Sequence, residues 1–317
     1  MGGRNYKLRF QAMGKNYQVV IIGGGPAGLT AGLYCARSRL NTLLIEKGMI
    51  GGQITYAERV ENYPGFPKGI SGIELGQLIH EQAISYGLET LLAEVTKVVP
   101  SPRHNLVSTS EGDFVAESTI IASGSQFRKL GVPGEDKLVG KGVSYCATCD
   151  GPLFKGKTVA VIGGGDAAVT EALHLSKFAS SVKVIHRRHQ LRASKIFQER
   201  AMTEPKIEFI WDTVVTRIEG EGAVKKLMLK STKNAKISVL EVTGVFVAIG
   251  SEPNSTQWRG LLPLDEVGYI ITSELMETKI PGIFAAGDVR HNSARQAITA
   301  AGDGATAAIS AEKFLSL

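Results

Sequence analysis

The sequence has little cysteine and no long hydrophobic run. Three cysteines in 317 residues are too few for a disulfide framework and fit a reducing compartment. No stretch of about 18 residues is both apolar and free of charges and glycines, so no membrane-spanning helix or membrane partner is predicted. The first 16 residues lack the apolar run of a signal peptide, which predicts an intracellular, cytoplasmic protein.

A concentration of positive charge is also missing from most of the chain. The net charge is +6, but residues 1–16 contain Arg4, Lys7, Arg9 and Lys15 and no acid, so the rest of the chain is nearly balanced. Such a balance predicts no nucleic-acid partner. Residues 1–16 are expected to form a flexible extension.

The chain is long enough for two domains, and a glycine-rich motif opens the first. A predicted buried strand over residues 17–22 is followed by Gly23-Gly24-Gly25-Pro26-Ala27-Gly28 and a helical pattern over 29–38. In such a dinucleotide fingerprint the first glycine permits the tight turn, the second admits a pyrophosphate, and the third lets helix and strand pack closely. The next strand ends in Glu46, where a carboxylate can accept both ribose hydroxyls.

Other residues of the same domain are predicted to surround a flavin. Gly52 and Gln53 precede a rigid loop that contains Asn62, and this loop is expected to enclose the flavin ring, with an ordinary surface connector as the alternative. Further along, the small residue Gly124 at a strand end permits close approach to a ligand. A later strand ends in Gly287 and Asp288, and Arg295, Gln296 and Ala297 open a helix of small residues whose N-terminus is also expected at the flavin site. Asp288 suits a ribityl hydroxyl, although an acid at this position is also typical of an ordinary helix N-cap.

The opening motif recurs 140 residues later, as Gly163-Gly164-Gly165-Asp166-Ala167-Ala168 after a predicted strand over 158–162. The strand that follows this second fingerprint ends in His186-Arg187-Arg188, with Arg192 four residues further on. An NAD site would have an acid here, whereas guanidinium groups suit the 2′-phosphate of NADP. The alternative is a solvated basic surface.

Between the two fingerprints lies Cys146-Ala147-Thr148-Cys149-Asp150. Zinc sites use the same cysteine spacing but usually need a second pair, and the only other cysteine is Cys35 in a predicted helix. We therefore predict a redox-active disulfide and no metal.

In order and spacing, these motifs resemble those of low-molecular-weight thioredoxin reductases over nearly all of residues 17–317. The resemblance implies an α/β fold with two Rossmann-like dinucleotide-binding domains of the three-layer ββα type. It implies an FAD domain made of residues 1–122 and 248–317, with an NADPH domain at 123–247 that carries the cysteine pair. It further implies a homodimer and a domain rotation during turnover. Asp166 departs from the Asn or Ser common in the family, and its carboxylate would oppose nucleotide binding unless it points away.

The implied reaction passes electrons from NADPH through FAD to the disulfide, and then to thioredoxin or a thioredoxin-like protein. By the same resemblance, Cys146 attacks the substrate and Cys149 faces the flavin. Asp150 is the candidate proton donor and acceptor, with capping of the next turn as the alternative.

Three other functions use the same residues. The reductase could take electrons from another donor, or a flavin-dependent dithiol oxidase could pass them to oxygen. The oxidase would have no need of Arg187 and Arg188. A non-enzymatic, flavin-bound redox sensor would bind a partner according to the oxidation state of Cys146 and Cys149.

Overall fold

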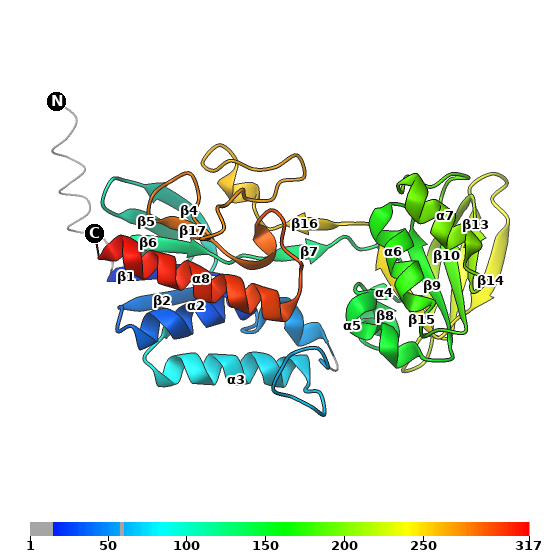
Figure 1. Ribbon diagram of the computed structural model, residues 1–317, viewed down its shortest axis with the longest axis horizontal. Helices are drawn as coiled ribbons and strands as arrows, with labels where there is room; N and C mark the ends of the chain where they lie inside the picture. The colour runs from blue at the N-terminus through cyan, green and yellow to red at the C-terminus, as the bar shows by residue number, and fades with distance from the viewer. Residues whose placement is uncertain (1–14, 58–59, 317) are drawn as a thin grey trace. The chain divides into compact units, whose positions relative to one another are not determined.

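The computed structural model describes residues 15–57 and 60–316, which divide into two compact units (Figure 1). Unit 1 consists of the described residues up to Gln126 and from Glu252 onward, and unit 2 of Phe127–Ser251. Each division lies four residues after the boundary predicted from the sequence. Residues 1–14 of the expected extension lie outside the described residues. Lys15 and Asn16 were wrongly placed in that extension, because Asn16 begins the first strand and Lys15 pairs with Glu89.

Unit 1 is built on a seven-stranded sheet of order β3-β2-β1-β6-β5-β4, with β17 also paired to β6. Its strands are β1 (Asn16–Ile22), β2 (Thr42–Glu46), β3 (Glu89–Leu92), β4 (Val95–Pro100), β5 (Asn105–Thr109), β6 (Gly112–Ile121) and β17 (Ile283–Ala285). Strands β3, β2, β1, β6 and β17 are parallel, and β4, β5 and β6 pair antiparallel. Residues 89–99 form two strands, because the chain leaves the parallel edge after Leu92 and pairs with β5 from Val95 onward.

Small residues let the helices of unit 1 pack closely. These helices are α2 (Pro26–Arg37), α3 (Gly72–Ser85) and α8 (Ala297–Leu315), with the 3-10 helices η1 (Gly52–Tyr56), η3 (Thr256–Trp258) and η4 (Gly287–Val289). A Cβ at Gly304 in α8 would lie 2.0 Å from the carbonyl oxygen of Ala27 in α2. The alanine-rich sequence of α8 thus places a late segment of the chain directly against the first fingerprint.

Unit 2 contains a five-stranded parallel sheet of order β11-β10-β9-β15-β8 and a separate antiparallel sheet of order β12-β13-β14. The strands are β8 (Val143–Ser144), β9 (Thr158–Gly163), β10 (Ser181–Ile185), β11 (Ile207–Ile210), β12 (Thr213–Glu219), β13 (Lys226–Ser231), β14 (Ile237–Glu241) and β15 (Gly244–Ala248). The helices are α4 (Glu135–Leu138), α5 (Ala147–Asp150), η2 (Gly151–Phe154), α6 (Asp166–Leu175) and α7 (Lys195–Thr203).

The same supersecondary motif occurs once in each unit. In unit 1, β1 leads through a glycine turn to α2 and then to the parallel neighbour β2, with Ile22 opposite Ile45. In unit 2, β9 leads through the second glycine turn to α6 and then to β10, with Ile162 opposite Ile185. The predicted α/β fold with two dinucleotide-binding domains is confirmed.

The chain passes between the units along two short segments. These are β7 (Ser125–Phe127) and β16 (Ser251–Pro253), which pair with each other as a two-stranded sheet. Next to them, the backbone amide of Arg128 donates to the carbonyl oxygen of Gly250 at 3.0 Å. The first and last residues of unit 2 are therefore neighbours.

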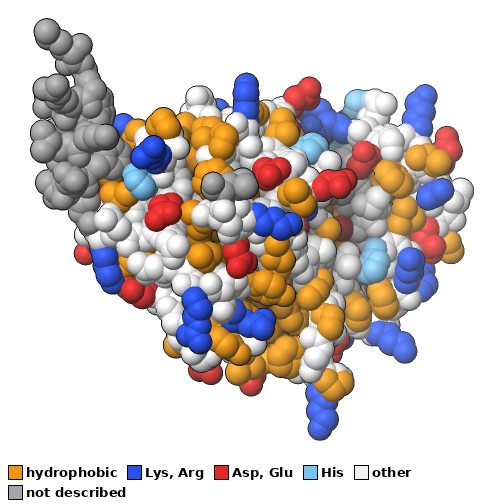
Figure 2. All heavy atoms as spheres, turned by 60° about the vertical axis from the view of Figure 1, so that its left-hand side comes forward, with side chains coloured by type: hydrophobic (Ala, Val, Ile, Leu, Met, Phe, Trp, Pro, Cys, Tyr) orange, Lys and Arg blue, Asp and Glu red, His pale blue; other side chains and the backbone are white. Residues whose placement is uncertain are grey.

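Charges of both signs are mixed on the face of the molecule that Figure 2 presents, with hydrophobic side chains among them. Among the helices of residues 15–57 and 60–316, none is both long and apolar enough to cross a bilayer.

Candidate active site

The first fingerprint forms a tight turn between β1 and α2. A Cβ at Gly23, whose φ is +112°, would lie 2.3 Å from the carbonyl oxygen of Ala122, and one at Gly28 would lie 1.8 Å from that of Gly23. A side chain at either position would break the turn or force α2 away from it. Pro26 and Ala27 begin the helix, and no described side chain caps it.

Glu46 lies at the end of β2 beside this turn. Its Oε2 accepts from the amide of Gly24 at 2.6 Å, and its Oε1 accepts from the amide of Gly48 at 2.8 Å. Each carboxylate oxygen keeps a lone pair for a further donor such as a ribose hydroxyl. Gly52 lies close to the first fingerprint, since a Cβ there would lie 2.9 Å from the Cα of Gly25. Gln53, the next residue, is exposed in η1.

The C-terminal segment brings Gly287 and Asp288 to the same place. A Cβ at Gly287 would lie 2.8 Å from that of Ala27 in α2. The carboxylate of Asp288 accepts from the Ser293 hydroxyl at 2.9 Å, and burial raises its pKa. Sequence reasoning missed Asp303 of α8, which accepts from the amide of Gly287 and from two nitrogens of Arg290 at 2.6 and 2.9 Å. This buried ion pair holds the turn before Asp288 against α8.

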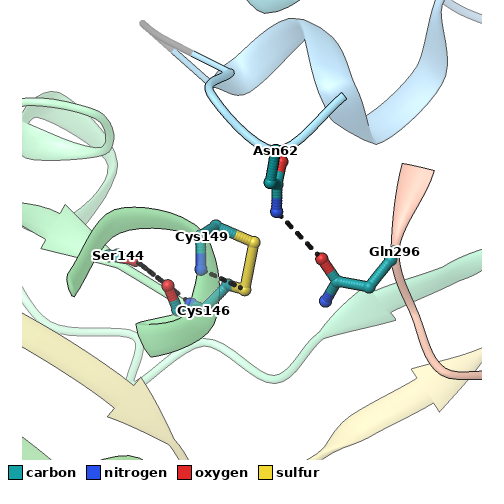
Figure 3. The surroundings of a disulfide bond; sticks show 5 residues. All are labelled: Asn62, Ser144, Cys146, Cys149 and Gln296. Atoms are coloured by element: carbon teal, nitrogen blue, oxygen red, sulfur yellow. Dashed lines mark hydrogen bonds between the residues drawn. A yellow bond between two sulfur atoms is a disulfide. The ribbon is translucent and has the colours of Figure 1, made fainter. Parts of the chain in front are cut away.

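The remaining residues predicted to bind FAD also lie in unit 1. The amide of Asn62 donates to Oε1 of Gln296, the residue before α8 begins at Ala297, as Figure 3 shows. Arg295 has a positive φ of 54° and lies over the ring of Tyr269. Gly124 is in the left-handed region, with φ +67°, and a Cβ placed there would meet no atom within 4 Å.

Asn254 is a second residue that sequence reasoning missed. Its backbone amide donates to the carbonyl oxygen of Gly124 at 3.0 Å, and its side chain donates to that of Ser123 at 2.8 Å. Ser123 returns a hydrogen bond from its hydroxyl to the carbonyl oxygen of Asn254. Three hydrogen bonds with Asn254 thus hold the turn at Gly124 in place.

These features fit an FAD molecule. A Cβ at Gly25 would meet nothing nearer than the carbonyl oxygen of Gly51 at 4.0 Å, so the N-terminus of α2 is open to an approaching pyrophosphate. Glu46 at the end of β2 and Asp288 in η4 each carry a carboxylate of the kind that accepts hydrogen bonds from sugar or ribityl hydroxyls.

The second fingerprint repeats this arrangement in unit 2. A Cβ at Gly163 would lie 2.6 Å from that of Ala168 and 2.4 Å from the carbonyl oxygen of Ala248, so turn, helix and sheet are in close contact. A Cβ at Gly165 would meet no atom within 4 Å, and no described side chain caps α6. The N-terminus of α6, with Asp166 and the exposed Ala167 in its first turn, therefore fits the pyrophosphate of NADPH.

The basic segment 186–194 is held against this fingerprint by backbone contacts. The carbonyl oxygen of Gly164 accepts from the amides of Arg192 at 2.7 Å and Ala193 at 3.2 Å. His186 is 5% exposed, its Nε2 lies 3.1 Å from the carbonyl oxygen of Gln190, and burial lowers its pKa. The buried imidazole is therefore neutral and stabilises the basic segment through its hydrogen bond with Gln190.

The guanidinium groups of this segment are exposed. Arg187, Arg188 and Arg192 lie in the solvent, while Leu191 and Ala193 between and beside them are buried against Val169 of α6. Three cations therefore face the solvent, and the backbone of Arg192 lies against the second fingerprint, a combination that suits a 2′-phosphate.

Asp166 has a partner of its own. Its Oδ1 accepts from the backbone amide of Ser194 at 2.6 Å, at the start of α7. The carboxylate is thus neutralised in part by the N-terminal end of that helix and fastens the end of the basic segment to α6. The effect of Asp166 on nucleotide binding stays a prediction.

A disulfide joins the residue before the short helix α5 to a residue within it. Cys146 and Cys149 are bonded with their Cα atoms 5.3 Å apart, and both are half-buried (Figure 3). The amide of Cys149 donates to Sγ of Cys146 at 3.2 Å. Within residues 15–57 and 60–316, no group of three or more His, Cys, Asp or Glu side chains is arranged to hold a metal ion.

Asp150 ends α5 directly after Cys149. Burial raises the pKa of its carboxyl group, and a hydrogen bond with the Ser144 side chain partly opposes this rise. Its side chain caps no turn, since η2 has no side-chain cap. A carboxyl whose pKa is raised in this way holds a proton closer to neutral pH than an exposed aspartate does.

Comparisons with known proteins agree with this geometry. Residues 17–304 match the family described as pyridine nucleotide-disulphide oxidoreductase. The chain is 45% identical over 302 residues to the thioredoxin reductase of Bacillus subtilis, covering 95% of both chains. It is 47% identical over 300 residues to that of Streptomyces coelicolor, covering 94% of this chain and 93% of the relative. The crystal structure of thioredoxin reductase from Streptococcus pyogenes superposes with a TM-score of 0.92 at 43% identity, covering 95% of this chain and 98% of that one.

Proposed function

The chain belongs to the pyridine nucleotide-disulphide oxidoreductases and, within them, to the thioredoxin reductases, and we propose that it reduces the disulfide of a thioredoxin or thioredoxin-like protein with electrons from NADPH. The observation that carries this proposal is the half-buried Cys146–Cys149 disulfide in a chain with two dinucleotide-binding folds. Two cysteines three residues apart can exchange two electrons with another dithiol of similar potential.

The cofactors are FAD and NADPH, which supply hydride and electron transfer when bound. We propose that unit 1 holds FAD through the N-terminus of α2, Glu46, Asp288 and the N-terminus of α8. Unit 2 would hold NADPH through the N-terminus of α6 and the guanidinium groups of residues 187, 188 and 192. Support for this division comes from the acid at the end of β2 and the cations after β10.

The chemistry of the cysteines follows from their surroundings. Two electrons and two protons convert the disulfide into two thiols. Cys146 is suited to attack, because the hydrogen bond from the amide of Cys149 stabilises negative charge on its sulfur. Its thiolate breaks the substrate disulfide and forms a mixed disulfide, and the released substrate thiolate takes a proton. Cys149 then loses its proton and attacks Sγ of Cys146, which releases the second substrate thiolate and restores the original disulfide. Asp150 is the group we assign to receive the proton of Cys149.

The direct test mixes the purified yellow protein with an oxidised thioredoxin and NADPH, and follows absorbance at the NADPH band. We expect one NADPH to be consumed for each thioredoxin disulfide reduced, and a much slower reaction with NADH. A dithiol oxidase would instead consume oxygen without NADPH, and a redox sensor would not turn over. Either result would refute the proposed function.

We also propose that the protein is a homodimer that works in the cytoplasm. Several large apolar side chains of unit 1 are exposed on and around α2 and α3, and such surface is usually covered by a partner; they are Tyr34, Ile73, Leu78, Ile84, Tyr86 and Leu92. Sedimentation equilibrium should give twice the chain mass of 33.8 kDa. A single species at the chain mass would contradict the dimer. Cell fractionation tests the location.

A further inference from the structure

Tyr145, the residue before the first cysteine of the disulfide, makes contacts that the reaction described above leaves unexplained. Strand β8 ends at Ser144, which pairs with Phe246 of β15, and Tyr145 continues the chain beyond the sheet. Cys146 itself makes local contacts. Its amide donates to Oγ of Ser144 at 3.1 Å, and its carbonyl oxygen accepts from the amide of Asp150 at 3.1 Å (Figure 3). A bond from Tyr145 to more distant residues therefore bears directly on where Cys146 lies.

Such a bond joins Tyr145 to the buried carboxylate of Glu135 in α4. The tyrosine hydroxyl donates to Oε1 of Glu135 at 2.9 Å, and Glu135 is 2% exposed. The same carboxylate accepts from the backbone amides of Leu130 at 2.9 Å and Gly131 at 2.8 Å. Three donors thus converge on one buried acid, which offsets the cost of burying its charge. Burial, followed by the hydrogen bond with Glu135, raises the pKa of Tyr145, so the phenol keeps its proton and stays a donor.

The ring of Tyr145 has a second partner in Phe127. The two rings are stacked, with their centroids 5.4 Å apart and their planes at 11°. Phe127 ends β7, and the next residues of the chain include the two amides that donate to Glu135. Tyr145 is thus fastened at its ring and at its hydroxyl to the first residues of unit 2.

Cys149 is placed by a different part of unit 2. It lies in α5, whose residue Ala147 is fully buried in one core cluster with Leu175 of α6. Cys146 stands just outside this helix, as its N-cap residue, with the extended backbone angles φ −146° and ψ 100°. The position of its sulfur relative to that of Cys149 therefore depends on the preceding chain, which Tyr145 holds, as well as on the helix.

We propose that Tyr145 is a positioning residue that, through its hydrogen bond with Glu135, keeps Cys146 beside Cys149 when the two are reduced. In the oxidised state the covalent bond already restrains both sulfurs. In the dithiol state that restraint is gone, and noncovalent contacts preserve the close approach from which the disulfide forms again. The proposal rests on the proposed function, because the two cysteines must be reduced and joined again only if they exchange electrons with a substrate.

The test measures the equilibrium of the disulfide with glutathione in wild type and in Tyr145→Phe. One protein disulfide and two glutathione molecules give two protein thiols and one glutathione disulfide. The anaerobic holoenzyme is equilibrated with mixtures of reduced and oxidised glutathione, and its free thiols are trapped with iodoacetamide and counted by mass spectrometry. The variant keeps the aromatic ring but loses the hydrogen bond, so the dithiol state gains chain freedom. The equilibrium constant for reduction of the disulfide should rise by at least about five-fold.

Tyr17→Phe is the matched control. The Tyr17 hydroxyl donates to Oε2 of Glu89 at 3.0 Å, so this variant loses a hydrogen bond of the same kind in unit 1, which does not contain Cys146 and Cys149. It should leave the constant unchanged. The same shift in Tyr17→Phe as in Tyr145→Phe, or no shift in Tyr145→Phe, would overturn the proposal.

A second background tests whether Tyr145 acts through Glu135. In Glu135→Gln the charged acceptor is gone, so adding Tyr145→Phe should shift the constant less than it does in wild type. If Glu135→Gln loses its cooperative unfolding, Glu135→Asp takes its place, because it withdraws the carboxylate by one methylene group. An equal shift in both backgrounds would show that the hydroxyl acts without Glu135, and would also overturn the proposal.

The glutathione equilibrium needs neither thioredoxin nor NADPH, so it separates this proposal from the proposed function. A wild-type protein that reduces no thioredoxin, together with the expected shift in Tyr145→Phe, would refute the function and keep the role of Tyr145. A protein that reduces thioredoxin, with the same constant in both forms, would do the opposite.

Discussion

Cys149→Ser should lower the rate of NADPH-dependent thioredoxin reduction by at least about a thousand-fold, while NADPH still bleaches the flavin. Cys146 alone can form a mixed disulfide but has no neighbouring thiol to resolve it, so the reaction stops after one encounter. Cys146→Ser should lose the same activity, because Cys149 then has no disulfide partner in the chain. Anaerobic stopped-flow absorbance measures flavin reduction, and NADPH consumption with thioredoxin measures turnover.

The matched control for both variants is Cys35→Ala. Cys35 is 1% exposed in the core of unit 1, and burial raises the pKa of its thiol to about 12, so it is neither accessible nor nucleophilic. Turnover should be retained in this variant. A non-reducing gel of Cys149→Ser with oxidised thioredoxin should show a covalent adduct that Cys146→Ser lacks. An adduct on Cys149 in its place would reverse the roles assigned to the two cysteines.

Replacing Arg187 and Arg188 together by alanine should raise the KM for NADPH by about a hundred-fold and leave the KM for NADH nearly unchanged. Hydrogen bonds to a charged group contribute about 1.5 to 3 kcal/mol each, and NADH lacks the 2′-phosphate that would receive them. The segment itself should stay in place, because the contacts that hold it use the carbonyl oxygen of Gly164 and the side chains of His186 and Asp166.

Initial rates with each coenzyme over a range of concentrations provide the measurement. Lys230→Ala, which removes an exposed cation from β13 of the same unit, controls for the general loss of positive charge and should change neither KM by more than about two-fold. An equal rise of both KM values in the double variant would show that the arginines do not recognise the 2′-phosphate.

Much of the fold could be predicted because glycine marks its turns. The strand, turn and helix of each fingerprint follow from close contacts that only glycine allows, and these contacts are visible at Gly23 and Gly163. Strands with weak patterns were missed. Strand β14 has four exposed residues and one half-buried one, so no alternation reveals it. Helix α7 has a single buried residue, Ala201, and therefore only a faint apolar face.

Site residues could be predicted where they belong to a sequence motif. Residues that only hold other segments of the site in place by hydrogen bonds could not. Asp303, Asn254 and Ser144 are of this second kind. Each forms a hydrogen bond with the backbone of a residue that lies either far away in the sequence or across a turn. Nothing in their local sequence distinguishes them from ordinary polar residues. An acid within the alanine-rich run of α8 is the one available signal, because a charge among buried small residues usually has a fixed partner. The roles of the individual site residues toward FAD and NADPH stay predictions.

The adjacency of Arg128 and Gly250 has a consequence for the independence of the two units. Because β7 and β16 pair side by side, the chain leaves unit 1 and returns to it at neighbouring residues. The ends of unit 2 already meet, so closing unit 1 without it would cost little chain entropy. By the same reasoning, cutting at this ribbon and joining 126 to 252 with a short turn is the natural way to separate the two units.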